Sequence, residues 1–508
     1  MNIAGLGLAV LTLAAGGANA DSDVFVPNSS LRAILKLEAP AQAQFDALPS
    51  HAKSLFNDAA ANGLLGSTEQ VQAFLSLNLA ADRLELLLQD NCVLCHTNPD
   101  NQEERTLFSI DPAQPQHGSA EQMNLSGFAA DTHLRQGLSC SGCHGGAPTD
   151  TDMVPAIYAR WPTAEVRASS RTWIPEFCAR CHADPAFMRQ YNPALPTDQL
   201  AKYATSRHGE LLLVQKDSKA AQCTSCHGVH NIQRPENRGS WVHPQKIPFT
   251  CAKCHSDAQY MAGYKMSDGK ALPTNQFADY KDSVHGKALL ERGDLGAPRC
   301  NSCHGNHAAM PPQIASIAQV CRTCHVANGA LFDGSKHKLA FRQHDWPECS
   351  QCHGHHAVQK PQDSWIGDTP GTLCEGCHST FARHNATCSA TSAAFRTTIN
   401  ELAAGVARYT PKAVAVAEDG LDAEPLAQSV AELEDSLRQS RSRIHAFDLS
   451  DFQQAAAPGL AAMTKADELV KAADAEFSFR RKGLAVAIAI MVYLAVILYF
   501  KIRQVDRN

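Results

Sequence analysis

A five-residue pattern, Cys-x-x-Cys-His, constrains this chain more than any other feature of its sequence. The pattern occurs nine times and uses eighteen of the nineteen cysteines. We number the copies motif 1 to motif 9 in chain order: Cys92/Cys95/His96, Cys140/Cys143/His144, Cys178/Cys181/His182, Cys223/Cys226/His227, Cys251/Cys254/His255, Cys300/Cys303/His304, Cys321/Cys324/His325, Cys349/Cys352/His353 and Cys374/Cys377/His378. A pattern repeated without exception indicates one repeated chemistry.

Three chemistries use closely spaced cysteine pairs: a disulfide, a zinc site and covalent attachment of haem c. A redox disulfide of the thioredoxin kind would occur once, at the start of a helix. Zinc sites combine such pairs at regular separations and do not need a histidine after each second cysteine. Haem attachment does need it, because the two thiols bind the porphyrin edge while the adjacent imidazole ligates the iron. The sequence therefore predicts nine covalently attached haems c.

A second histidine follows three of the motifs at a fixed distance. It is the last residue of "CTSCHGVH", "CNSCHGNH" and "CSQCHGHH", where it is His230, His307 and His356. Such a histidine is held near its own haem but points away from that iron. We therefore expect it to ligate a neighbouring haem, and the alternative is a hydrogen bond to a haem propionate.

The motifs belong to a longer repeated unit. "YATSRHGELLLVQKDSKAAQCTSCHGVH" matches "YKDSVHGKALLERGDLGAPRCNSCHGNH", and in both a Ser-x-His-Gly histidine, His208 or His285, lies fifteen residues before the first cysteine. A weaker copy has His337 or His344 upstream of motif 8, and the weakest has His117 or His133 upstream of motif 2. Repetition of one supersecondary unit predicts a row of haem pairs, each with its distal ligands supplied locally.

The histidines outside the motifs outnumber the haems, since the chain has 23 histidines and nine of them belong to motifs. We expect low-potential irons with two histidine ligands. The predicted distal ligands are His117, His133, His208, His230, His285, His307, His337, His356 and His384, with His445 near the carboxy terminus as a further candidate. Rival candidates are His51, His243, His344 and His355, and Met188, Met261 or Met310 would give irons of higher potential.

The spacing of the motifs predicts the fold class. Between Cys92 and His378 the chain has about 32 residues per haem, too few to build an ordinary apolar core around each one. We expect a mainly α protein with much irregular loop, a multihaem cytochrome c fold organised around stacked haem pairs. A helical segment at 21–90 precedes this nonahaem domain at 91–390, and a helical stalk at 391–476, rich in Ala, Leu, Glu and Arg, follows it. In the stalk region we expect Cys388 to be a buried thiol and Tyr409 to lie at a helix end.

Both ends of the chain carry apolar runs. Residues 1–20 end in Ala-Asn-Ala and are typical of a signal peptide. "GLAVAIAIMVYLAVILYF", from Gly483 to Phe500, is 18 residues without a charge, so 477–508 is predicted to be a transmembrane anchor with a short cytoplasmic tail. Because haem c is attached outside the bacterial cytoplasmic membrane, we expect the haem domain in the periplasm. The net charge of −6 argues against nucleic acid as a partner.

The Ser-x-His-Gly to CxxCHGxH unit resembles bacterial multihaem c-type cytochromes with paired CxxCH motifs, in particular membrane-anchored periplasmic electron carriers. The resemblance extends from about Asp90 to His384. It implies that His208 and His285 are distal ligands. It also implies electron transfer between the membrane quinone pool, or a membrane cytochrome b partner, and periplasmic redox proteins.

The alternative is a multihaem oxidoreductase that acts on nitrite, hydroxylamine or tetrathionate at one open haem. Nitrite and tetrathionate reductases of this kind mark the active haem with CxxCK, which does not occur in this sequence. Hydroxylamine oxidoreductases instead cross-link a tyrosine to the active haem. Tyr409 is the one tyrosine between motif 9 and the apolar anchor.

Overall fold

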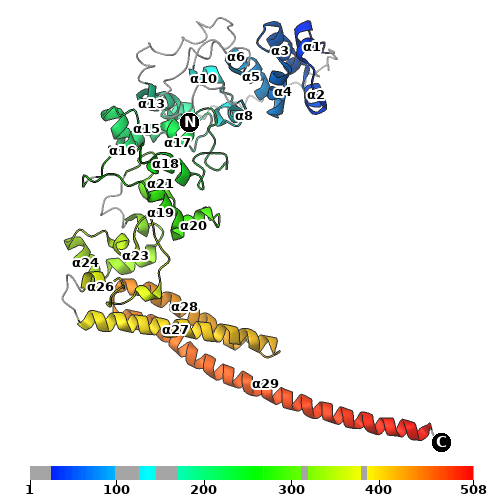
Figure 1. Cartoon of the computed structure of the whole chain (residues 1–508), viewed down its shortest axis with the longest axis vertical. Coiled ribbons are helices and arrows are strands. Elements are labelled where there is room, and N and C mark those ends of the chain that lie inside the picture. The colour runs from blue at the N-terminus through cyan, green and yellow to red at the C-terminus, as the bar shows by residue number, and fades with distance from the viewer. Residues whose placement is uncertain are drawn as a thin grey trace, which may run out of the picture. The chain divides into compact units, whose positions relative to one another are not determined.

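The computed structural model describes residues 25–97, 125–144, 170–266, 268–310, 319–378 and 386–506. Within these ranges all regular structure is helical, apart from one isolated bridge between Lys265 and Ala271 (Figure 1). The mainly α prediction is therefore confirmed. The chain divides into two compact units, Met1–Thr250 and Cys251–Asn508. The expected signal peptide, His117 and His384 lie outside the described residues.

The first unit begins with a small helical body. Its helices are α1 (Ser29–Ile34), α2 (Ala39–Asp46), α3 (Ser50–Ala61), α4 (Thr68–Ser76), α5 (Ala81–Leu88) and α6 (Asn91–Thr97). They pack around an apolar core that includes Leu31, Phe56, Phe74 and Leu87. The sequence predicted helices here, but it did not predict that this segment would have an ordinary hydrophobic core that extends to motif 1.

The remainder of the first unit consists of short helices and loops. They are α8 (Leu125–Ala129), α9 (Thr132–Arg135), α10 (Cys140–His144), α13 (Ser170–His182), α14 (Pro185–Met188), α15 (Gln199–Thr205), α16 (Arg207–Gly209), the π-helical turn η2 (Glu210–Val214), α17 (Cys223–His227) and α18 (Ile247–His255), which contains the unit boundary. Each motif here lies on a helix or at its end.

The second unit continues in the same manner. It contains α19 (Gln276–Asp282), α20 (Val284–Leu290), α21 (Cys300–His304), α23 (Val326–Asp333), α24 (Lys336–Gln343), α25 (Glu348–His353), the 3₁₀ turn η3 (Asp363–Trp365) and α26 (Glu375–His378). The apolar core of this region is small, with Tyr280, Ala288, Leu289 and Ala297 as its buried members. So small a core fits a segment that folds around bound cofactors.

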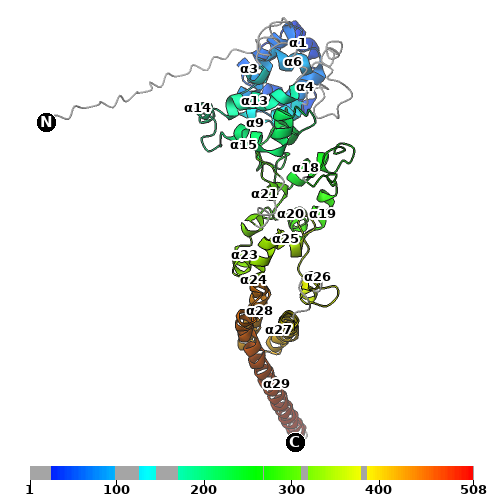
Figure 2. The same cartoon turned by 90° about the vertical axis from the view of Figure 1, so that its left-hand side faces the viewer.

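Three long helices complete the second unit. They are α27 (Ala386–Glu418), α28 (Glu424–Arg443) and α29 (Leu449–Val505), and the 3₁₀ turn η4 (Ile444–Ala446) joins the last two. Figure 2, read with Figure 1, shows α27 and α28 side by side with the first part of α29. The core of this stalk includes Phe395, Leu402, Leu433 and Phe452.

The last part of α29 continues alone beyond the stalk. Among the described helices, α29 is the one that is long and apolar enough to cross a membrane, with a mean hydropathy of 2.6 over a window that is not buried at all. This finding is consistent with membrane anchoring.

Tyr409 is not the helix-end residue that the sequence predicted. Helix α27 continues through Pro411 to Glu418, and Tyr409 is 1% exposed in the stalk core. Burial, followed by the neighbouring Asp467, raises the pKa of its phenol. Cys388, at the start of α27, is partly buried, and burial raises the pKa of its thiol.

Close helix packing in the stalk depends on Gly459. A Cβ atom there would lie 2.7 Å from Ser436 Cβ, whereas a Cβ atom at Gly483 would meet nothing within 4 Å. We expect Gly459→Ala to destabilise the stalk by about 1–3 kcal/mol. Gly483→Ala, the control, should be neutral or stabilising by up to about 1 kcal/mol. Thermal unfolding followed by circular dichroism measures both variants. Equal unfolding midpoints would contradict close packing of α28 against α29 at Gly459.

Candidate haem sites

Local hydrogen bonds fix the short helices that carry the upstream histidines. Around His285, the Ser283 hydroxyl accepts a hydrogen bond from Gly286 N at 3.0 Å and donates one to Tyr280 O at 2.6 Å. Around His208, the Ser206 hydroxyl likewise accepts a hydrogen bond from Gly209 N at 2.9 Å and donates one to Tyr203 O at 2.6 Å. The repeat found in the sequence is therefore also a repeat of structure.

The glycine of the Ser-x-His-Gly motif is required by a close backbone approach. A Cβ atom at Gly286 would lie 2.0 Å from Tyr280 O, which no side chain could tolerate. Tyr280 also donates its hydroxyl to Pro298 O at 2.9 Å, two residues before motif 6. The tyrosine thereby fixes the histidine-bearing helix against the motif that follows it.

The sequence analysis missed this aromatic position. Tyr203 repeats the role of Tyr280, since its hydroxyl donates to Ala221 O at 2.8 Å. Phe128 and Phe332 stand at the same spacing, five residues before His133 and His337. An alignment of all four upstream histidines would have shown an aromatic residue followed three residues later by serine or aspartate.

Five motif histidines each face one histidine from elsewhere in the chain. The ring centres are 5.9 Å apart for His133 and His182, 6.3 Å for His285 and His325, 6.0 Å for His304 and His356, 6.0 Å for His337 and His378, and 6.1 Å for His353 and His445. A metal–imidazole bond is about 2 Å long and the ring centre lies roughly 1 Å beyond the nitrogen, so two axial imidazoles on one iron have centres about 6 Å apart. Each pair therefore fits the two faces of a single haem.

The pairing skips the nearest motif. His133 lies just before motif 2 but faces His182 of motif 3, and His285 lies before motif 6 but faces His325 of motif 7. His356, which follows motif 8, faces back to motif 6. His133 and His285 thus face the second motif of their own haem pair, motif 3 or motif 7, whereas His356 faces a motif of the preceding pair.

Buried members of these pairs are in the protonation state that a metal requires. Burial, and then His378, lowers the pKa of His337 to about 4. Burial, and then His355 and His304, lowers the pKa of His356 to about 4. At neutral pH both rings are neutral, with a nitrogen lone pair available to an iron.

The rival histidines have other contacts. His344 stacks on Trp346, with ring centres 4.7 Å apart, so it is His337 that faces a motif. His355 Nδ1 accepts a hydrogen bond from His356 N at 3.0 Å. His51 forms an ion pair with Glu85. His243, Met188 and Met261 are buried, and Met310 is exposed.

The remaining predicted ligands are not tested by these pairs. His208, His230 and His307 lie in the described part of the chain and stay predictions. His230 also meets the Phe128 ring edge to face, with centres 6.2 Å apart. The side chains of Cys95, His96 and His144 lie outside the described residues.

Cysteines of consecutive motifs lie next to one another. The first cysteines of motifs 3 and 4 (Cys178 and Cys223) are hydrogen-bonded, as are those of motifs 5 and 6 and of motifs 7 and 8. The second cysteines of motifs 2 and 3 are also neighbours, since burial, Asp131 and then Cys181 raise the pKa of Cys143. None of the eighteen cysteines whose side chains the structure describes forms a disulfide. Their sulfur atoms would therefore bring the edges of neighbouring haems together.

The second cysteines of motifs 4 and 7 are more exposed than the first cysteines of those motifs, whereas motif 5 shows no such difference. Cys226 and Cys324 are exposed, unlike the partly buried first cysteines of their motifs, and Cys254 is partly buried. Cys226 lies near the Tyr203 phenol, and Cys324 is a neighbour of Cys303, the second cysteine of motif 6. Neither exposure nor these neighbours tests a thioether bond. Haem attachment at Cys226, Cys254 and Cys324 therefore stays a prediction from the motif.

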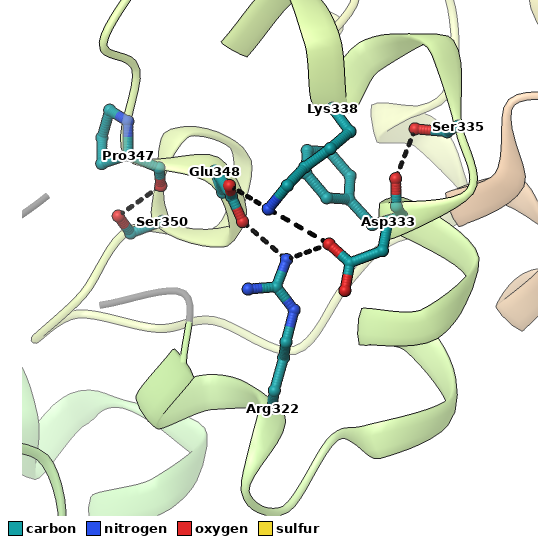
Figure 3. Close-up of polar contacts among 8 residues, drawn as sticks. Arg322, Asp333, Ser335, Lys338, Pro347, Glu348 and Ser350 are labelled. Atoms are coloured by element: carbon teal, nitrogen blue, oxygen red, sulfur yellow. Dashed lines mark hydrogen bonds and ion pairs between the residues drawn. The ribbon is translucent and has the colours of Figure 1, made fainter. Parts of the chain in front are cut away.

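A four-charge cluster lies between motifs 7 and 8 (Figure 3). Arg322, inside motif 7, pairs with Asp333 at 2.8 Å and with Glu348, the residue before motif 8, at 2.6 Å. Lys338, next to His337, pairs with Asp333 at 3.1 Å and also with Glu348. The cluster is electrically balanced, and it holds two haem motifs and one ligand-bearing helix together.

A family model described as "Cytochrome c7 and related cytochrome c" matches residues 236–326. The match covers motifs 5, 6 and 7, so the chain contains a cytochrome c7-like multihaem domain with covalently bound haem c. Neither a curated protein nor a solved structure matches the chain.

Loss of Arg322 should destabilise the second unit. Its side chain and that of Glu348 are each only 13% exposed. Arg322→Ala therefore leaves a largely buried carboxylate with one cation fewer, which should lower the free energy of unfolding by about 2 kcal/mol. The control is Arg438→Ala, which removes a pair with Asp435 whose side chains are 74% and 51% exposed. That change should cost less than about 0.5 kcal/mol. Thermal unfolding of the haem-loaded protein measures both, and equal losses would contradict a structural role for the cluster.

Proposed function

We propose that this chain is an electron-transfer cytochrome that carries nine haems c. Each haem is attached through the two cysteines of one motif and ligated by the histidine of that motif. The observation that carries the proposal is the set of five opposed imidazole pairs, which supply the second axial ligand for motifs 3, 6, 7, 8 and 9. When bound, each haem iron accepts and releases one electron.

Two imidazoles on one iron occupy both axial positions, so a substrate has no place to bind there. This favours a carrier over the multihaem oxidoreductase. The tyrosine that a hydroxylamine oxidoreductase would use also fits poorly. Tyr409 lies more than twenty residues along α27 in the stalk core, about 35 Å from the start of that helix near motif 9.

The cysteine contacts support an electron path in chain order within each unit. In the first unit, Cys178 of motif 3 meets Cys223 of motif 4, and Cys143 of motif 2 is a neighbour of Cys181. In the second unit, similar contacts join motifs 5 to 9 one after another. Neighbouring haem edges then permit direct transfer from each haem to the next.

The stalk supports a particular class of membrane partner. At about 1.5 Å per residue, α29 extends about 50 Å from Leu449 to Gly483, where the uncharged segment begins. His445 places the motif 8 haem at the far end of this stalk. Even at a tilt of about 40° that haem would be about 40 Å from the bilayer surface, too far for direct electron tunnelling. We propose an anchor in the bacterial cytoplasmic membrane, a periplasmic haem region, and a membrane cytochrome b or similar subunit whose redox centre projects to this height.

Electron paramagnetic resonance of the oxidised protein tests the carrier proposal. We expect nine haems per chain by mass spectrometry, all of them low-spin, because two imidazoles produce a strong ligand field. The reduced protein should not bind carbon monoxide. A high-spin iron among the nine, together with carbon monoxide binding, would instead indicate an active site.

A vesicle experiment tests the partner class. With the full chain in lipid vesicles that contain a quinol, we expect no haem reduction on the timescale of turnover, because the stalk keeps the motif 8 haem, the proposed entry point, about 40 Å from the bilayer. A small soluble reductant should reduce the same sample at once, as a control for competent haems. Haem absorbance follows both reactions, and fast reduction by the quinol alone would contradict the proposed partner.

A further inference from the structure

One of the upstream histidines has a carboxylate beside it. Asp131 lies two residues before His133, at the position where the other three copies have Ser206, Ser283 and Ser335. Its Oδ1 atom accepts a hydrogen bond from His133 N at 2.8 Å and lies 2.9 Å from His133 Nδ1. Its side chain is 2% exposed, so solvent does not screen this contact.

The carboxylate is held firmly in this orientation. Asp131 Oδ2 accepts a hydrogen bond from Ile232 N at 2.7 Å. Thr132 N, in turn, donates to Ile232 O at 2.7 Å, so the loop that follows motif 4 is bonded to both residues before His133. Two backbone donors and the imidazole therefore position one buried carboxylate.

The corresponding atoms at other haem sites have weaker partners or none. His445 Nδ1 lies 2.8 Å from the carbonyl oxygen of Ser442. His304 Nδ1 lies 3.2 Å from the carbonyl oxygen of Met310. In the described part of the chain, the buried Nδ1 atoms of His337 and His378 have no hydrogen-bond partner. Among the Nδ1 atoms compared, that of His133 is the one with a carboxylate at hydrogen-bond distance; at motif 6 the Asp279 carboxylate acts on His356 through its charge alone.

We propose that Asp131 lowers the reduction potential of the motif 3 haem below the potentials of the motif 6, 8 and 9 haems. A carboxylate that accepts the Nδ1 proton makes the imidazole a stronger electron donor, and its negative charge favours Fe(III) over Fe(II). The inference rests on the proposed ligation of this haem by His133 and His182, and not on the carrier role. Asp131 is a positioning residue, since it acts through His133.

Serine in the other copies cannot act in this way. The Ser283 hydroxyl donates its proton to Tyr280 O and accepts from Gly286 N, so it supplies no charge to the neighbouring His285. The replacement of serine by aspartate in one copy of the repeat thus changes the reduction potential of one haem. On stepwise reduction, the motif 3 haem would be filled after the motif 6, 8 and 9 haems, and electrons passing it would meet an uphill step.

Potentiometric titration followed by electron paramagnetic resonance tests the inference. The His133 and His182 planes are 83° apart, whereas those of His304 and His356 are 23° apart, so the motif 3 haem should give a low-spin signal of distinct anisotropy. Loss of that signal in His133→Met identifies it. If His133→Met removes no signal, the ligation itself is wrong and the inference falls with it, while the carrier role stands.

Two variants remove the charge. Asp131→Asn keeps the shape of the side chain, and Asp131→Ser introduces the residue of the other copies, which still caps the helix. In both we expect the one-electron equilibrium constant of the identified haem to rise about tenfold, which is about 59 mV, with the other potentials unchanged. As the control, Asp82→Asn removes an exposed carboxylate of the first unit, outside the haem sites, and should shift no potential.

Two results would overturn the proposal. One is an unchanged midpoint for the identified haem in both Asp131 variants at full haem content. The other is a high-spin signal in both variants, because Asp131 would then hold His133 on the iron instead of tuning its potential.

Discussion

Every haem of the proposed kind imposes one geometric demand, which is an imidazole on each face of the iron with ring centres about 6 Å apart. The motif supplies the first imidazole within five residues, but the second must come from a distant part of the chain. His285 meets His325, His356 meets His304, and His445 meets His353. The first of these contacts lies within one haem pair, but His356 reaches back to the preceding pair and His445 comes from the stalk, so the repeats do not fold as fully separate haem pairs. The ligands themselves join the region into one structure and offset its lack of apolar core.

Polar contacts stabilise the haem-motif region of the second unit, where the apolar core is small. The Arg322 and Lys338 cations and the Asp333 and Glu348 carboxylates join motif 7, α24 and motif 8. Partly buried charges of this kind contribute only when every member has a partner, as here. The serine caps and tyrosine hydroxyl bonds of two upstream helices serve the same end, since they fix the short helices that carry His208 and His285.

The nine motifs and the Ser-x-His-Gly unit could be recognised in the sequence, because covalent haem attachment and helix capping each depend on residues a few positions apart. The choice of His337 over His344 depends on packing, since both lie upstream of motif 8 and only the structure shows His344 stacked on Trp346. The position of Tyr409 was predicted wrongly because Pro411 does not end its helix: α27 continues past it, supported by its neighbours in the stalk. The sequence also led us to expect distal ligands from within a haem pair or beside a neighbouring haem, but it did not predict which motif each histidine faces, because spacing along the chain does not specify a partner in space.

The turn between α28 and α29 is where the stalk and the haem region meet. Within a few residues it supplies His445 to motif 8 and Phe447, whose ring centre is 3.7 Å from that of His337, the proposed ligand of motif 9. Arg441, one turn earlier, pairs with Asp363 in the loop between these two motifs at 2.7 Å. The turn that leads into α29, the helix with the candidate membrane span, thus contacts both of the last haem sites in the chain. We propose that electrons passing between the membrane side and this unit enter or leave at the motif 8 or motif 9 haem, because the stalk supplies the proposed axial ligand of one and packs against the proposed ligand of the other.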